Sequence, residues 1–306
     1  MPQYRHHGGG QAGARRAGPV EGESALKVEL VPRETLAGAI GVGRGDVVAL
    51  VGAGGKTSAL RLLAAELSVG GGRVLATTTT AMLLREMAAV GPVLVLEDHG
   101  GQAAGLRDVS ADRRWAAVAR AELEGGKVAG LSPAAVDRLW ALGSADCLIV
   151  EADGSRGLPL KAFGPHEPQV PSVTTTLVLV GGLDALGAPL VEDRVHRADV
   201  LASTLQIPIG SVVTPRVMAD AVRAQVVRLR QSRAGRRIVV LLNKADGPDS
   251  RAAGLEVAQL LLGREDDGVA RRDAADLPIG TRDVRPDSVV VCSLRAGRVA
   301  VVAEGK

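Results

Sequence analysis

Runs of mostly apolar residues alternate along this chain with segments whose apolar residues recur at helical spacing. The runs that indicate buried strands cover residues 47–51, 146–150, 175–180, 237–242 and 288–292. The segments that indicate helices cover 56–67, 132–142, 198–205, 216–231 and 250–262. Strands that are apolar on both faces and alternate with helices are typical of a parallel sheet covered on both sides. The pattern therefore predicts an α/β fold with a mostly parallel sheet and helices on both faces.

Weaker patterns fill the remaining intervals. They predict strands at 73–77, 93–96 and 127–129 and helices at 82–89 and 112–124, with 288–292 as the last strand. Residues 1–25 are rich in Gly, Arg and Ala, whereas 263–287 are charged and interrupted by Gly and Pro. We predict a disordered N-terminal extension over 1–25, one α/β domain over 26–306, and a loose charged insertion at 263–287.

Composition narrows the functional classes. Hydrophobic residues make up 46% of the chain, but aromatic residues only 1%. The net charge is +3, so the chain is mildly basic. Sequence-tolerant binders of single-stranded nucleic acid stack bases on aromatic side chains, which this chain almost lacks, so nucleic acid is not an expected partner. The two cysteines, Cys147 and Cys292, lie in apolar runs and are expected to be buried and without a catalytic role.

No apolar run is long enough for a membrane span, and residues 1–24 lack the apolar centre of a secretion signal. We therefore expect a cytoplasmic protein that does not insert into a membrane. The oligomeric state is left open by the sequence.

Clusters of polar or glycine residues follow the predicted strands. They lie at 52–58, 77–80, 151–156, 181–184 and 243–246. Parallel α/β sheets bind ligands at the carboxyl ends of their strands. The clusters are therefore expected to meet at one edge of the sheet and form a single site.

The first cluster has the composition of a phosphate-binding loop. After a strand it reads Gly52, Ala53, Gly54, Gly55, Lys56, Thr57 and Ser58. Glycines allow backbone N–H groups to approach phosphate oxygens, and the following helix N-terminus adds partial positive charge. Lys56 is expected to reach the β and γ phosphates and Thr57 to hold Mg²⁺. The standard spacing requires Gly at position 50, where this chain has Leu50, so the loop resembles the shorter loops of Mur ligases and metal-chaperone GTPases. A plain glycine turn is the alternative.

The cluster after the strand at 146–150 contains two acids and a base. Glu151 and Asp153 are candidates for binding Mg²⁺ or its waters, because this ion needs only one or two protein carboxylates. The spacing does not decide between them. Arg156 is expected to approach a phosphate or an anionic substrate. A capped turn with solvated charges is the alternative.

The cluster Asn243, Lys244, Ala245 and Asp246 matches the Asn-Lys-x-Asp segment with which many GTPases read guanine. Asn243 and Asp246 are expected to contact the edge of the base, and Lys244 to lie along the base and ribose. A buried carboxylate accepts hydrogen bonds from guanine N–H groups that adenine does not have, so it favours GTP over ATP. A chance match of four residues is the alternative.

Four further residues are candidate substrate contacts. Thr78 and Thr79 belong to a run of four threonines at a strand end, where a hydroxyl can position a metal or a water. His166 and Glu167 follow the acidic cluster, and the histidine is a candidate general base or metal contact. A strand-end cap for the threonines and an ordinary loop residue for the histidine are the alternatives.

The segment from Val150 to Lys161, with Glu151, Asp153 and Arg156, and then His166, Glu167 and Pro168, resembles the signature of the YqeC family. Residues 51–57, 77–80 and 243–246 fit the same family, and the resemblance extends over about 35–300. The family is described as selenium-dependent hydroxylase accessory or selenium cofactor biosynthesis proteins. The resemblance implies a nucleotide-using maturation factor whose partner is a selenium-dependent molybdenum hydroxylase or its cofactor-assembly proteins.

These observations predict a P-loop NTPase-like protein that binds GTP or ATP with Mg²⁺ and hydrolyses it, with GTP preferred. Lys56, Glu151, Asp153 and Arg156 are the predicted catalytic residues, and Thr57, Glu151 and Asp153 the predicted Mg²⁺ ligands. An ATP-dependent ligase or kinase, or a scaffold that senses nucleotide without hydrolysing it, are the competing interpretations.

Overall fold

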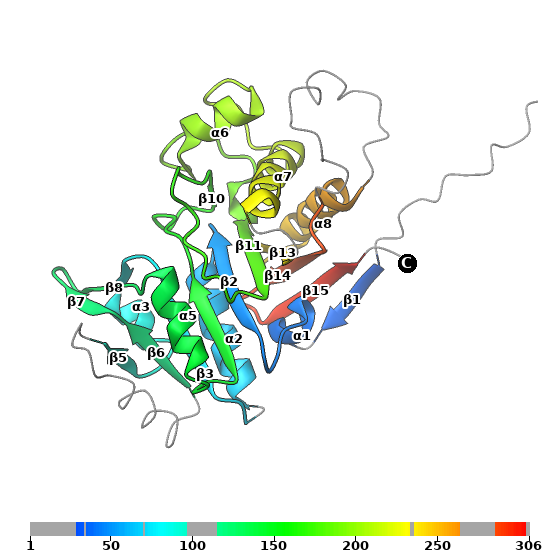
Figure 1. The fold of residues 1–306 in the computed structure, drawn as a ribbon. Helices are drawn as coiled ribbons and strands as arrows, with labels where there is room; N and C mark the ends of the chain where they lie inside the picture. Colours follow the sequence, from blue (N-terminus) through cyan, green and yellow to red (C-terminus); the bar gives the residue numbers. More distant parts are fainter. Residues whose placement is uncertain are drawn as a thin grey trace, which may run out of the picture.

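The computed structural model describes residues 29–33, 35–69, 71–96, 115–232, 236–263 and 285–303. Its centre is a ten-stranded sheet in the order β1-β15-β14-β13-β11-β2-β9-β3-β6-β5 (Figure 1). These strands are β1 (Glu29–Arg33), β2 (Val47–Gly52), β3 (Val74–Thr78), β5 (Val93–Val95), β6 (Trp115–Ala119), β9 (Cys147–Glu151), β11 (Thr176–Gly182), β13 (Arg237–Asn243), β14 (Ser288–Ser293) and β15 (Arg298–Ala303).

The strands from β14 to β5 in this order pair in parallel, and only β15 and β1 join antiparallel, at one edge. Every residue of β2, β9 and β11 is buried, because these central strands are covered on both faces. This covering is why their sequences read as continuous apolar runs rather than alternating ones. Each Val or Leu buried in this way contributes about 1.5–3 kcal/mol.

Helices cover both faces of the sheet, which confirms the predicted fold class. On one face, α1 (Leu36–Ile40) and α2 (Lys56–Val69) pack against Val48, Leu50 and Val178. On the other face lie α5 (Pro133–Ala141), α6 (Ala198–Leu205), α7 (Pro215–Ser232) and α8 (Pro248–Leu262). Neighbouring residues of a strand thus pack on opposite faces of the sheet, as Val48 and Ala49 do.

One predicted helix is wrong. The interval 112–124 contains β6 and β7 (Ala121–Leu123), with 112–114 outside the described residues. Its alanines favour a helix in isolation. In the fold, however, Ala116 and Val118 pack beneath α5 while Ala117 and Ala119 pack in a separate cluster on the opposite face. Burial on both faces of the sheet therefore overrides the local preference.

Two other predictions need correction. Residues 82–89 begin as β4 (Met82–Leu83) and only then form α3 (Leu84–Ala88), because β4 pairs with β8 (Lys127–Ala129) in a three-stranded sheet with β7. The strand over 288–292 is β14, but β15 follows it and turns back antiparallel. The predicted extension at 1–25 and most of the predicted insertion at 263–287 lie outside the described residues.

A small ribbon beside the main sheet bears on the site. In it, β10 (Leu160–Lys161) pairs in parallel with β12 (Val195–His196), and a short 3-10 helix, η1 (Leu183–Ala185), follows β11. Within the described ranges, the helices lack the combination of length and apolarity that crossing a bilayer requires.

Candidate functional site

The loops that follow β2, β9 and β11 are joined to each other by backbone hydrogen bonds at the carboxyl edge of the sheet. Ala53 N donates to the carbonyl of Val180 at 2.9 Å, and Gly54 N donates to that of Leu158 at 3.1 Å. Gly182 N donates to the carbonyl of Pro159 at 2.8 Å. The loop after β2 therefore meets the loops after β9 and β11, as the order of parallel strands requires.

Two glycines of the first loop are explained by this close approach. A Cβ atom on Gly54 would overlap the backbone of Gly182 and the carbonyl of Pro159. A Cβ atom on Gly55 would overlap the side-chain amide of Asn243. Both glycines also have positive φ, 84° and 135°. A side chain at either position would separate the loops that the site brings together.

The backbone N–H groups of the first loop fall into two sets. Those of residues 52, 53 and 54 donate within the protein, to Asp153 and to the carbonyls of Val180 and Leu158. The next four, on residues 55 to 58, have no acceptor among the described residues. They form the N-terminus of α2, where Ser58 is exposed. Four N–H groups and a helix N-terminus are a suitable cradle for an oxyanion.

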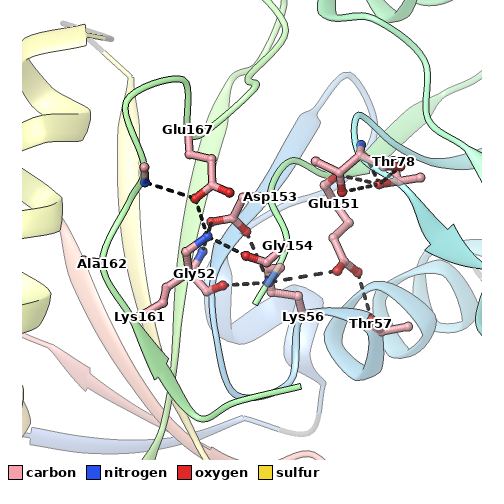
Figure 2. Close-up of polar contacts among 12 residues, drawn as sticks. Gly52, Lys56, Thr57, Thr78, Glu151, Asp153, Gly154, Lys161, Ala162 and Glu167 are labelled. Atoms are coloured by element: carbon pink, nitrogen blue, oxygen red, sulfur yellow. Dashed lines mark hydrogen bonds and ion pairs between the residues drawn. The ribbon is translucent and has the colours of Figure 1, made fainter. Parts of the chain in front are cut away.

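Lys56 lies beside this cradle but is held by the protein (Figure 2). Its ammonium donates to the carbonyl of Gly52 at 2.6 Å. It also lies 3.2 Å from Oδ1 of Asp153 and 4.0 Å from Oε1 of Glu151. The predicted phosphate-binding lysine is therefore buried and compensated by two carboxylates.

Glu151 is the acid that faces the start of α2. It ends β9, and its Oε2 accepts a hydrogen bond from the hydroxyl of Thr57 at 2.9 Å. Burial raises the pKa of Glu151 to about 7, while Lys56 and the Thr57 hydrogen bond act in the opposite direction. At neutral pH the carboxyl therefore holds its proton part of the time. Arrival of a positive charge would favour the ionised form.

Asp153 has a different environment. Its side chain has no exposed surface, and its Oδ2 accepts hydrogen bonds from Gly52 N and from Nζ of Lys161, both at 2.9 Å. Its Oδ1 faces Lys56 without a well-directed hydrogen bond. This carboxylate is enclosed by two ammonium groups and a loop amide. Its surroundings are those of a buried counter-ion rather than of a metal ligand with room for water.

Lys161 and Glu167 continue the row of alternating charges (Figure 2). Lys161 is fully buried and donates to Asp153, to the carbonyl of Gly154 at 2.5 Å and to Oε2 of Glu167 at 2.6 Å. Glu167 also accepts two hydrogen bonds from the guanidinium of Arg197, at 2.7 and 3.1 Å. Burial alone would raise the pKa of Glu167, but the hydrogen bonds from Arg197 and Lys161 lower it to about 2.

The sequence interpretation did not select Lys161, His196 or Arg197 as site residues. A signal for Lys161 exists, since it is the one charge in the apolar stretch 158–163. Arg197 and His196 follow β11 by more than ten residues and reach the site through the pairing of β12 with β10. Sequence spacing carries no sign of that pairing.

The candidate substrate contacts are largely engaged within the protein. The hydroxyl of Thr78 donates to the carbonyl of Glu151 at 3.0 Å, and that of Thr79 to the carbonyl of Gln169 at 2.8 Å. Both threonines thereby fix the loops after β3 and β9. Glu167 is bound to two cations, as described above. Only His166 has an exposed side chain.

Asn243 lies inside the site and links it together. Its Nδ2 donates to the carbonyl of Gly54 at 2.9 Å, and its Oδ1 accepts from Leu294 N at 3.1 Å. The side chain is 4% exposed. The side chain of Asn243 therefore connects the first loop to the turn after β14.

Lys244 and Asp246 lie nearer the surface. Lys244 has a left-handed backbone with φ 71° and pairs with Asp184 at 2.6 Å. Oδ1 of Asp246 accepts a hydrogen bond from the hydroxyl of Ser293 at 2.5 Å. A carboxylate that reads guanine is expected to be buried, but the side chain of Asp246 is exposed. A base would itself have to bury this carboxylate.

Arg156 lies in the loop that links β9 to β10. Its side chain is exposed and makes no hydrogen bond or ion pair with any residue in the described ranges, and its φ is 53°. Both cysteines are buried, and burial raises the pKa of each thiol to about 12. Such thiols are protonated and unreactive at neutral pH.

These features define an α/β protein of the P-loop NTPase-like class, with a glycine loop and an adjacent acid at the carboxyl edge of a mostly parallel sheet. Residues 48–199 match the family described as YqeC protein. A relative from Escherichia coli (strain K12), called "Uncharacterized protein YqeC", is 32% identical over 176 residues, which is 50% of this chain and 58% of the relative. Through this segment the chain belongs to the YqeC family.

The matched segment covers less than two thirds of the relative's length. The family match over 48–199 includes the glycine loop, Glu151, Asp153 and Lys161, and it ends in the first turn of α6. The segment 243–246 lies outside the family match. Family membership therefore extends to the candidate phosphate-binding half of the site, and the candidate base-reading half depends on the geometry alone.

Proposed function

We propose that this protein binds a nucleoside triphosphate with Mg²⁺ and hydrolyses it at the carboxyl edge of its sheet. One observation carries the proposal. At the start of α2 the four N–H groups of residues 55–58 lack acceptors among the described residues, and Lys56, Thr57 and Glu151 lie beside them. Phosphate oxygens satisfy such a cradle, and the lysine supplies charge for the outer phosphates.

The residues beside the cradle are suitable for Mg²⁺. The hydroxyl of Thr57 and the carboxylate of Glu151 offer hard oxygen ligands next to each other. In the described ranges no group of three or more His, Cys, Asp or Glu residues is arranged to hold a metal. An ion at this position would thus take further oxygens from phosphate and water, as Mg²⁺ usually does. When bound, it neutralises charge on the phosphate oxygens.

Glu151 and Asp153 have separate roles in this proposal. Glu151, in its ionised form, would hold the ion together with Thr57. Asp153 orients Lys56 and compensates its charge within the protein. To contact a phosphate, Lys56 exchanges the carbonyl of Gly52 for a phosphate oxygen. Most of the rate enhancement would come from positioning and charge neutralisation, as in phosphoryl transfer generally.

GTP is the proposed nucleotide. Asp246 keeps a carboxylate at the end of β13, oriented by Ser293, and guanine offers two neighbouring N–H donors to such a group. Lys244, oriented by Asp184, borders the same position. Asn243 supports the arrangement by joining the loop after β2 to the turn after β14.

The biological role we propose follows from the family resemblance. A nucleotide-dependent step would assist the maturation or insertion of the cofactor of a selenium-dependent molybdenum hydroxylase, in the cytoplasm. An ATP-dependent ligase or kinase is a second candidate, favoured by Arg156 near the site, a cation that has no partner in the part of the chain that the structure describes. A nucleotide-sensing scaffold without turnover is the third.

Calorimetry with GTP and ATP, each with Mg²⁺, tests the proposal, followed by phosphate release. We expect GTP to bind more tightly and to be hydrolysed slowly. Lys56→Ala should weaken nucleotide binding strongly and abolish hydrolysis while the protein remains folded. Binding of neither nucleotide to the wild-type protein would refute the proposed function. Tight binding without turnover, even with a hydroxylase present, would favour the nucleotide-sensing scaffold.

A further inference from the structure

Several basic side chains lie around β10 and β12, together with the acids Asp153, Glu167 and Glu192. Asp153 and Glu167 are each shared between two cations, Lys56 and Lys161 in one case and Lys161 and Arg197 in the other. Arg228 adds a guanidinium whose partners are the carbonyls of residues 163, 164, 165 and 167. Arg156 adds another and has no partner in the described ranges.

His196 lies beside several of these charges. It pairs in register with Lys161 across the β10–β12 ribbon, and it is 7% exposed. Its Nδ1 is buried without a hydrogen-bond partner. A buried nitrogen in this state destabilises the fold unless a ligand or a water satisfies it. The imidazole is therefore a polar group for which the protein itself supplies no partner.

The electrostatic surroundings of His196 are positive. Burial lowers its pKa, and Arg197, Lys161 and Arg156 lower it further, against the weaker opposite effect of Glu167. The imidazole is therefore neutral at pH 7 and offers one N–H donor. A neutral donor surrounded by cations is complementary to an oxyanion.

This region adjoins the phosphate loop. Lys161 donates to the carbonyl of Gly154, two residues before Arg156. Two residues after Arg156, the carbonyl of Leu158 accepts from Gly54 of the loop. Arg156 thus lies in a short segment held at one end by the charge row and at the other by the proposed nucleotide site.

We infer that Arg156 and His196 form a second anion site beside the phosphate loop, which receives the oxyanion group of a second substrate. The shared chemistry is that of a phosphate or a carboxylate. This inference rests on the proposed function only for the presence of a nucleotide in the neighbouring site. It assigns to Arg156 a ligand other than the γ phosphate.

The experiment titrates inorganic phosphate and, separately, acetate into the full-length protein saturated with GDP and Mg²⁺. Imidazole signals are followed by ¹⁵N NMR, with His196→Gln identifying the signal of interest. We expect at least one of the two anions to perturb the His196 signal and to raise its pKa by about 0.5 unit or more, because a nearby negative charge favours the imidazolium. A response of the His196 signal to phosphate alone would indicate that the site binds a phosphoryl group, and a response to acetate would indicate that it binds a carboxylate.

Variants test the assignment of residues. Arg156→Gln should weaken anion binding about tenfold or more, through loss of a charge-assisted hydrogen bond. Arg138→Gln, an equal change of charge at an exposed position on α5, should leave anion binding unaltered. Binding of neither anion, or equal binding to wild type and Arg156→Gln, would overturn the inference.

Two further outcomes separate this inference from the proposed function. If Arg156→Gln weakens GTP but not GDP, Arg156 serves the γ phosphate and the second site is refuted. If the wild type binds no nucleotide, the proposed function fails, but the anion titration proceeds on the protein alone. The second site then stands if Arg156→Gln, and not Lys56→Ala, removes the effect of the anion on His196.

Discussion

Nζ of Lys56 lies 3.2 Å from Oδ1 of Asp153, and the side chains are 2% and 0% exposed. The positive charge of the lysine in the glycine loop is therefore compensated by a carboxylate inside the protein before any phosphate binds. A nucleotide must compete with this contact, or the ammonium must serve both groups at once. Glu151, the last residue of β9, and Asp153, two residues later, therefore have different surroundings, since only Glu151 also contacts Thr57.

Asp153→Asn tests the role of Asp153 as a counter-ion. Removal of its charge leaves Lys56 and Lys161 with less compensation, so the free energy of unfolding should fall by about 3–5 kcal/mol. Urea denaturation measures this loss. Asp193→Asn, at an exposed position, should change stability by less than about 0.5 kcal/mol. Loss of Mg²⁺ dependence in a folded Asp153→Asn protein, with stability unaltered, would instead make Asp153 a metal ligand.

Lys56→Met tests the phosphate cradle. Asp153 keeps its hydrogen bonds from Gly52 N and Lys161, so the protein should remain folded. The affinity for triphosphate should fall about a hundredfold, which corresponds to about 2.7 kcal/mol. Calorimetry measures the loss, and Lys127→Met, at an exposed position on β8, is the control. Unchanged affinity would exclude this loop as the phosphate site.

Glu151→Gln tests the raised pKa. Between about pH 4.5 and 7 the native protein holds a proton on Glu151 that the unfolded chain has released, so wild-type stability falls as pH rises through this interval. The glutamine variant lacks this dependence. Relative to wild type, its free energy of unfolding without Mg²⁺ should increase by about 1–3 kcal/mol from pH 5 to pH 8. Urea denaturation measures both proteins at the two pH values. An equal difference in free energy of unfolding between variant and wild type at pH 5 and at pH 8 would contradict the prediction.

Glu167→Gln tests the lowered pKa of Glu167. The pKa of Glu167 is about 2, below its ordinary value, so its contribution to stability is present above about pH 4.5 and disappears as pH falls toward 2. At pH 7 the variant should lose about 1–3 kcal/mol, and the difference from wild type should narrow with acid. Thermal or urea unfolding at several pH values measures it. Glu122→Gln, exposed on β7, should show no such trend.

Asp246→Asn tests the choice of base. If the carboxylate reads guanine, the variant should lose its preference for GTP over ATP while the phosphate loop still binds both weakly. Calorimetry with the two nucleotides measures the ratio of affinities. Asp249→Asn, three residues further on in the first turn of α8, changes the same charge and should keep the ratio. An unaltered ratio in Asp246→Asn would remove the guanine assignment and favour the ligase or kinase.

The sequence determined those features that depend on local pattern. The central strands were recognisable because both of their faces are buried, which requires continuous apolar residues. The order of strand, glycine loop and helix was also readable, because each residue type there has a local conformational preference. The α/β class followed from the alternation of these elements.

Tertiary structure decided what depends on neighbours distant in the chain. Within the alanine-rich interval 112–124, residues 115–119 form a strand because the fold buries both of its faces between β3 and β5. Glu151 and Asp153 stand two residues apart, yet only contacts with Thr57, Lys56 and Lys161 distinguish their surroundings. His196 joined the site through the pairing of two short strands. Electrostatic roles depend on distances between side chains, and sequence spacing does not encode those distances.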